Sequence, residues 1–349
     1  MQEKMRQMIQ DIPSLLSQYE LGTFSNLSRA EGGFTNDNYI IETSKGKFFL
    51  KKYLRETNER ISREHQLLAY LKDQKFPIPG LIKNNEDNAL TEIDNKRFTF
   101  FDYIAGHTRV ATNSVTDEEL INIAKTLARY HYLAKNIPLD LEPIVPIWSR
   151  GALDHLYSDV IRHLSKKSFF DDFDREINSI LTHKINELHL APKIDTDELP
   201  SLLIHGDFHA ANMLFNEKGE VSAVVDWELA KHQPRIWEVI CAMVFACKTD
   251  WTWNFHTPLN FERAEVFLSI YHDINPLTQK ELEIVPDMLR LASADLTWPL
   301  KEHYLHKNFS SDRFLPKSAE NWFFWDNENI SQFKISILTK LSSLQKPLL

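Results

Sequence analysis

The residues best suited to chemistry lie in two short segments in the middle of the chain. The first, HGDFHAAN, covers residues 205 to 212, and the second, VVDWE, covers residues 224 to 228. Phosphoryl transfer requires a base beside the attacking hydroxyl and oxygen ligands that hold Mg²⁺ on the phosphates of ATP, because catalysis depends on positioning and charge neutralisation. Asp207 would supply the base, and Asn212 and Asp226 would supply two of the metal ligands. The two segments therefore predict transfer of a phosphate from Mg·ATP.

The spacing of these residues favours the same interpretation. Asn212 follows Asp207 by five positions, which is also the interval between the aspartate and the metal-binding asparagine in the catalytic loop of protein kinases. Asp226 comes 14 positions after Asn212, at the end of an apolar strand. The alternative interpretation is that these polar residues have a structural role and only cap two strands.

The elements that position these side chains fall into two groups. Residues 24 to 104 are predicted to form a small antiparallel sheet, because β-branched and aromatic runs alternate with turns, as in NYIIETSKGKFFLKKY. Two further strands are expected at 89 to 93 and 97 to 104, and one helix is expected from Glu56 to Asp73. This part of the chain should therefore contain five strands and one helix.

The rest of the chain is predicted to be mainly helical. After Gly106 the apolar residues recur at helical spacing, beginning with the acidic helix start at Asp117. Within this region, residues 202 to 228 are expected to form short apolar strands around the polar loop, with a hairpin turn at Lys218-Gly219. No repeat or low-complexity linker separates the two parts, so we expect two lobes packed against each other in an α+β fold.

Composition excludes several classes of protein. The 349 residues are 43% hydrophobic, enough for a substantial core, and the formal net charge of −9 argues against a nucleic-acid partner. The charge would suit a cationic substrate, although a soluble acidic surface explains it equally well. The only two cysteines, Cys241 and Cys247, lie in an apolar helical stretch and are interpreted as packing residues.

The sequence also predicts a protein that does not enter membranes. The longest unbroken apolar run has nine residues, from Val239 to Cys247, whereas a spanning helix needs about 20. The N-terminal segment mixes charged with apolar residues at helical spacing and lacks the basic start and apolar core of a signal peptide. We therefore expect a cytoplasmic protein that begins with a helix.

The segments HGDFHAAN and VVDWE resemble the motif of the aminoglycoside phosphotransferase and choline kinase superfamily, HGDxHxxN followed by a strand that ends in D-W/F-E/D. The match includes His205, Gly206 and His209 besides the three residues named first. The resemblance covers residues 20 to about 245. It implies a two-lobed, protein-kinase-like fold, with a nucleotide-binding lobe at 1–103 and a helical lobe at 104–349 that carries the catalytic loop and the acceptor site.

The resemblance further implies a lysine that reaches the phosphates of ATP and an acid that positions it. Lys51 follows the apolar triplet FFL, as the lysine does in such families, and alternation along the strand turns only one of Lys51 and Lys52 toward the cleft. Glu64 matches the family's helical acid in the stretch REHQLL. The alternatives without a function are an ordinary surface lysine for Lys51 and a solvated helix face for Glu64.

Two backbone features would complete the nucleotide site. Gly32 and Gly33, in EGGFTNDNY between the first two strands, occupy the place where kinase-like folds lay a hairpin over the phosphates, although a plain β-turn would need no ligand. Tyr103, in FDYIAG, marks the change from strand to helix and resembles the hinge whose main chain meets adenine.

The acceptor is predicted to be a small molecule that carries a hydroxyl. Amino alcohols, hydroxy amino acids, amino-sugar antibiotics and thiosugars are all compatible, and GGFTNDNYIIETSKGKFFLKKY looks most like homoserine-kinase-type and choline-kinase-like members. Acceptor recognition is expected after about Pro234, where Asp250, Trp251, Trp298 and Glu302 are candidates with an equal chance of a structural role. The alternative function is a catalytically quiet relative, as in spore-coat proteins of this superfamily, and the oligomeric state stays open.

Overall fold

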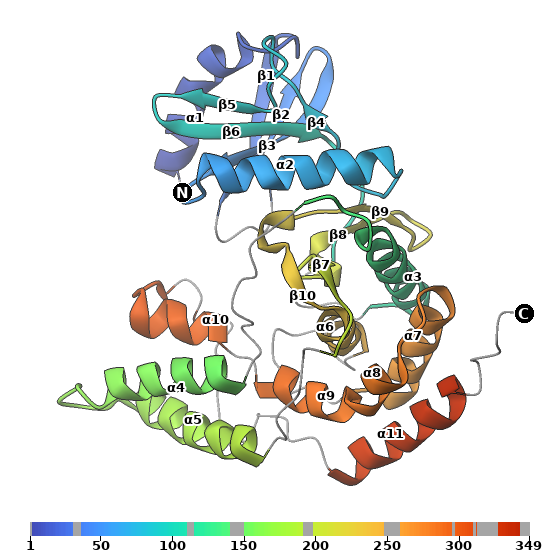
Figure 1. Ribbon diagram of the computed structural model, residues 1–349. Coiled ribbons are helices and arrows are strands. Elements are labelled where there is room, and N and C mark those ends of the chain that lie inside the picture. The colour runs from blue at the N-terminus through green and yellow to red at the C-terminus, as the bar shows by residue number, and fades with distance from the viewer. Residues whose placement is uncertain are drawn as a thin grey trace, which may run out of the picture.

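The computed structural model describes residues 2–30, 36–109, 115–139, 150–190, 198–247, 259–294, 297–309, 312 and 327–342. These residues form a smaller lobe, built on a β-sheet, and a larger lobe built mainly from helices (Figure 1). The expected α+β, two-lobed architecture is present. None of the helices described here is long and apolar enough to span a membrane.

The smaller lobe contains a sheet in which every paired strand is antiparallel. Its order is β1-β2-β3-β6-β4, with β5 also paired to β6, which makes six strands among the described residues. The strands are β1 (Phe24–Arg29), β2 (Asp37–Thr43), β3 (Gly46–Tyr53), β4 (Leu81–Ile82), β5 (Leu90–Ile93) and β6 (Lys96–Asp102). Five of them match the prediction. The sixth, β4, has two residues, which is too short to produce an alternating pattern in the sequence.

Alternation along the strands gives the sheet two covered faces. On one face the sheet contacts α1 (Gln2–Leu16), and Leu50, Phe98 and Phe100 are fully buried in that contact. On the other face lies α2 (Asn58–Asp73), toward the larger lobe (Figure 1). Lys51 follows Leu50 directly and therefore points to the α2 side. The predicted helical N-terminus is thus part of the smaller lobe.

The larger lobe follows a linker and begins with α3. Thr116 and Glu119 form a capping box at its start, where each side chain bonds the backbone N–H of the other residue. The helices of this lobe are α3 (Asp117–Ala134), α4 (Arg150–Leu164), α5 (Asp172–Leu190), α6 (Arg235–Cys247), α7 (Phe261–Ile274), α8 (Gln279–Glu283), α9 (Val285–Ala294), α10 (Thr297–Leu300), η3 (Lys301–Leu305) and α11 (Asn327–Ser342).

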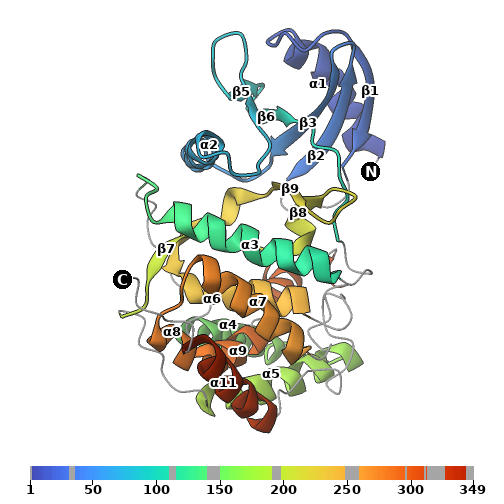
Figure 2. The same ribbon diagram turned by 90° about the vertical axis from the view of Figure 1, so that its right-hand side faces the viewer.

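Two short ribbons lie on top of these helices, next to the smaller lobe. The first pairs β7 (Ser201–Ile204) with β10 (Lys231–Pro234), and the second is a hairpin of β8 (Met213–Phe215) and β9 (Val221–Val224). The 3₁₀ turn η1 (Ala210–Asn212) comes directly before β8, and the 3₁₀ turn η2 (Trp227–Leu229) lies between β9 and β10. Figure 2 shows α3 directly below the hairpin, with α6 and α7 below α3.

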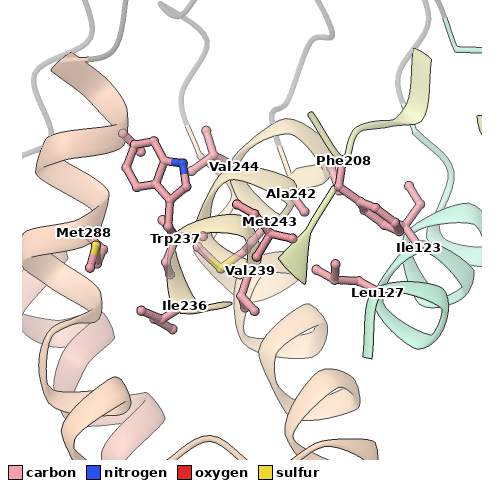
Figure 3. Packing of buried hydrophobic residues seen from close by; sticks show 14 of the residues in the cluster. Ile123, Leu127, Phe208, Ile236, Trp237, Val239, Ala242, Met243, Val244 and Met288 are labelled. Atoms are coloured by element: carbon pink, nitrogen blue, oxygen red, sulfur yellow. The ribbon is translucent and has the colours of Figure 1, made fainter. Parts of the chain in front are cut away.

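Helix α6 lies at the centre of the larger lobe's core. Its side chains Ile236, Val239 and Met243 are fully buried, and the neighbouring helices α3 and α9 contribute Leu127 and Met288 (Figure 3). Cys247 is buried and Cys241 is half-buried on this helix, and both are free thiols. This agrees with their interpretation as packing residues.

The end of α2 and the residues that directly follow it make several contacts with the larger lobe. The Tyr70 hydroxyl donates to the carbonyl of Leu133, and the N–H of Val224 donates to the carbonyl of Pro77 at 2.8 Å. Phe76 contacts the Trp227 ring edge-on, with 6.0 Å between the ring centroids. As a result, α2 and the larger lobe share one apolar cluster.

Candidate active site

The segment HGDFH forms a loop between β7 and η1 that is held from below. Glu238 of α6 accepts hydrogen bonds from the backbone N–H groups of His205 (3.1 Å) and Gly206 (2.6 Å). Glu238 is in turn 2.8 Å from Nε2 of the buried His131 on α3. Phe208 anchors the loop by packing between α6 and α3 (Figure 3). A buried carboxylate and a buried ring therefore fix the loop, which leaves Asp207 at its surface.

Gly206 has a backbone conformation and surroundings that require glycine. Its φ is +88°, in the left-handed region, and a Cβ placed there would lie 2.4 Å from the carbonyl oxygen of Leu229. The loop therefore passes directly against the segment that follows Asp226. The close approach of these two backbones brings the two predicted motifs into one site.

Asp207 is surrounded by hydrogen-bonding groups. The Asn212 amide donates to Asp207 Oδ2 and to its backbone carbonyl, both at 2.9 Å, and His209 Nε2 lies 3.0 Å from Oδ1. The side chain of Asp207 is 40% exposed. Burial on its other sides would raise the pKa of Asp207, but the charge and hydrogen bond of His209, together with His205 and Asn212, lower it to about 2. The carboxylate is thus ionised at neutral pH.

Asn212 and Asp226 lie at the same end of the β8–β9 hairpin. The N–H of Val225 donates to the carbonyl of Asn212 at 2.9 Å, next to the pair formed by Met213 and Val224. Because the amide nitrogen of Asn212 points to Asp207, its oxygen Oδ1 is the end that can ligate a cation. Asp226 has φ +67° and ψ +60°, and its side chain keeps 38% exposure. The two side chains therefore start from neighbouring backbone positions at one end of the hairpin.

The charges around Asp226 favour a bound cation. Burial raises the pKa of Asp226 to about 6, and Glu228, Asp207 and Glu64 add to the rise against the opposing effect of Lys51. Carboxylate and amide oxygens are the hard ligands that Mg²⁺ and Ca²⁺ prefer. Among the described residues no group of three or more His, Cys, Asp or Glu side chains forms a metal cage. Two protein ligands fit a metal that takes its other ligands from phosphates and water.

Lys51 lies between the two lobes and meets carboxylates from both. Its ammonium group is 3.2 Å from Glu64 Oε1 on α2 and 3.6 Å from Asp226 Oδ1 in the larger lobe. The Tyr53 hydroxyl donates to the other oxygen of Glu64 at 3.2 Å. Desolvation lowers the pKa of Lys51, but Glu64, Asp226 and the other nearby anions outweigh it and raise the pKa well above its usual value. The neighbouring Lys52 instead pairs with Asp11, on the opposite face.

The other residues singled out from the sequence include Tyr103, Glu302, Gly32, Gly33, Asp250 and Trp251. Tyr103 follows the end of β6 and is 39% exposed. In the pairing of β3 with β6, Lys51 is opposite Thr99 and Phe48 is opposite Asp102. Tyr103 is therefore displaced along the sheet from Lys51. Gly32 and Gly33, like Asp250 and Trp251, lie outside the described residues. Glu302 is buried, with hydrogen bonds to His306 and Asn308.

Several residues of the cluster were not predicted as site residues. Glu228 Oε2 is 3.1 Å from the Lys51 ammonium, and Asn36 donates to the same oxygen. Glu228 stands in the quoted motif, so its position in VVDWE was the available signal. No sequence pattern indicated the contacts of Glu238 and Asn36. Glu238 bonds to Gly206, 32 positions away, and Asn36 bonds to Glu228, 192 positions away.

A family model described as "Phosphotransferase enzyme family" matches residues 26–264, more than half of the chain. A homoserine kinase of Methylobacillus flagellatus is 26% identical over 278 residues, which cover 80% of this chain and 80% of that protein.

Solved structures of small-molecule kinases have the same fold. A spectinomycin phosphotransferase in complex with ADP and spectinomycin aligns with a TM-score of 0.66 at 15% identity, over 94% of this chain and 98% of the other. An amicoumacin kinase in complex with AMP-PNP and Ca²⁺ aligns with a TM-score of 0.58 at 16% identity, over 97% and 96%. The predicted protein-kinase-like fold is confirmed.

Proposed function

Because the chain belongs to the phosphotransferase enzyme family, we propose that it moves the γ-phosphate of Mg·ATP to a hydroxyl of a small molecule. One observation carries the proposal. Lys51 with its acid Glu64 comes from the smaller lobe, Asp207 with Asn212 comes from the larger lobe, and Asp226 lies 3.6 Å from Lys51 between them. The residues proposed as the phosphate-binding cation, the hydroxyl-orienting carboxylate and the metal ligands therefore come from both lobes and would act together between them.

Each side chain has a role in this proposal. Lys51, held by Glu64, would contact the α- and β-phosphates, and Asn212 and Asp226 would hold Mg²⁺. Mg²⁺ held by these two residues would neutralise the charge that develops on the phosphates. The main chain at Tyr103 would meet adenine. The backbone at Gly32 and Gly33 is predicted from the sequence to cover the phosphates.

Asp207 would receive the hydrogen bond of the acceptor hydroxyl and aim its oxygen at the γ-phosphorus. A carboxylate with a pKa of about 2 is a weak base, so the proton would pass to it as the new O–P bond forms rather than before. The bond from the γ-phosphorus to the β-phosphate oxygen breaks, ADP leaves, and Asp207 then gives the proton to water. Positioning by Asp207 is thus its larger contribution, as a loose transition state requires.

We propose a hydroxylated amine or hydroxy amino acid as the acceptor, with homoserine first, because the curated relative named above is a homoserine kinase aligned over most of both chains. The test is ADP production from Mg·ATP across homoserine, amino alcohols, amino-sugar antibiotics and thiosugars, with the phosphorylated product identified by mass spectrometry. We expect one chemical class to raise ADP production far above the ATPase background. Failure of Mg·ATP to bind in a thermal-shift assay would instead indicate a catalytically quiet protein.

A further inference from the structure

A buried polar contact joins the two lobes next to Lys51. Asn36, directly before β2, donates from Nδ2 to Glu228 Oε2 in η2 at 2.5 Å. Asn36 is 5% exposed and the Glu228 side chain is 8% exposed. The other end of the Asn36 amide accepts the N–H of Leu54 at 3.2 Å. The amide thus joins the start of β2, the end of β3 and the larger lobe. We call the contact between Asn36 and Glu228 the Asn36–Glu228 bridge.

The bridge ends on a partner of Lys51. Glu228 Oε2 lies 3.1 Å from the Lys51 ammonium, which also faces Glu64 and Asp226. An ammonium has three N–H donors, so these three carboxylates can occupy all of them. If Lys51 is to contact a phosphate, at least one carboxylate has to release it. Where Glu228 is held therefore affects how readily Lys51 turns to the nucleotide.

The energetics of buried groups indicate what Asn36 contributes. A hydrogen bond to a charged group is stronger than one between neutral groups, and a buried acceptor that loses its donor is destabilised. Without the Asn36 amide, the carboxylate of Glu228 would depend more strongly on Lys51 for compensation. Lys51 would then be drawn away from the phosphates.

We propose that Asn36 and Glu228 are positioning residues that hold Lys51 ready for the nucleotide and link the smaller lobe to the metal-binding segment at Asp226. The inference rests on the proposed function, because the role of Lys51 in ATP binding is part of that proposal. It predicts that breaking the bridge weakens Mg·ATP binding more than acceptor binding, since the bridge acts on Lys51, which is proposed to contact the phosphates.

The decisive variant is Asn36→Asp. It keeps the size of the side chain and an oxygen for the Leu54 N–H, but it places a carboxylate opposite Glu228 instead of a donor. We expect the Kd for Mg·ATP, measured by calorimetry, to rise roughly tenfold or more, since like charges now meet where a charge-assisted bond was. The KM for the acceptor should stay within about twofold.

The rescue variant is the double substitution Asn36→Asp with Glu228→Gln. It restores one amide donor and one carboxylate acceptor with their places exchanged, and it leaves the net charge of the pair unchanged. We expect the double variant to bind Mg·ATP at least roughly fivefold more tightly than Asn36→Asp alone, because contacting residues couple strongly. A purely structural loss at residue 36 would not be repaired by a change at residue 228.

The matched control is Asn84→Ala. Asn84 makes three hydrogen bonds inside the smaller lobe, with Glu86, Asn88 and Thr91, and none of them crosses the cleft. It should lower the unfolding midpoint while leaving the Kd for Mg·ATP unchanged. The proposal would be refuted if Asn36→Asp bound Mg·ATP with wild-type affinity. It would also be refuted if the effects of Asn36→Asp and Glu228→Gln on the Kd for Mg·ATP simply added in the double variant. If the wild-type protein binds Mg·ATP and transfers phosphate in that case, the proposed function stands without it; if the wild-type protein does not bind Mg·ATP, both fail.

Discussion

Replacing Asp207 with asparagine is expected to lower turnover by roughly a hundredfold or more while Mg·ATP still binds. The amide oxygen of the new side chain can accept the hydrogen bond from Asn212 that Asp207 Oδ2 accepts at 2.9 Å, so the loop should keep its shape. What disappears is the negative charge that orients the acceptor hydroxyl and takes its proton. The measurement is kcat with saturating acceptor, together with the Kd for Mg·ATP.

The control for this substitution is Glu220→Gln. Glu220 is an exposed acid in the β8–β9 hairpin, where it accepts a hydrogen bond from Asn216. It should leave kcat unchanged, which would show that loss of one acidic charge from this part of the surface is harmless. Near-normal turnover in Asp207→Asn would refute the assignment of Asp207.

Replacing Asp226 with alanine should abolish productive Mg·ATP binding, because it removes the only anionic ligand proposed for the metal. The dependence of the rate on Mg²⁺ concentration is the measurement, and no saturable dependence is expected. Asn212→Ala should act in the same direction but more weakly, since a neutral amide contributes less charge. An unchanged Mg²⁺ dependence in Asp226→Ala would contradict the metal site.

The variant Asp226→Asn distinguishes the effect of losing the carboxylate charge from the effect of backbone strain at this position. Asp226 has φ +67°, and asparagine tolerates this left-handed conformation better than alanine does. The asparagine variant should therefore be more stable than the alanine variant, by on the order of 1 kcal/mol, while it binds Mg·ATP almost as poorly. Recovery of Mg·ATP binding in Asp226→Asn would show that backbone strain, not the lost charge, caused the defect.

The sequence predicted the parts of this protein that depend on local pattern. Alternation predicted that Lys51 and Lys52 point to opposite faces, and the family resemblance selected Lys51, which the structure brings to Glu64 on the predicted helix. The fixed spacing in HGDFHAAN brought Asp207 and Asn212 together, because the loop and η1 close within a few residues. Strand β4 was missed because two residues carry no periodicity.

Long-range contacts account for what the sequence did not reveal. Glu238 holds the catalytic loop from 32 positions away, yet in the sequence it is one more acid on an apolar helix. Asn36 is one of several polar residues in the stretch EGGFTNDNY, and its contact with Glu228 exists only once the two lobes meet. Such pairings follow from the assembled fold, so neither propensity nor spacing could have indicated them.

The apolar cluster shared by α2 and the larger lobe has a consequence for unfolding. Leu67, Leu68 and Leu71 of α2 are buried together with side chains of α3 and α6, so the smaller lobe lacks a separate core on its inner side. Melting of one lobe should then expose the core of the other, and heat should unfold both in one cooperative transition. Differential scanning calorimetry would show a single peak that Mg·ATP moves upward as a unit. A separate low-temperature peak for the sheet and α1 would mean that the lobes melt independently.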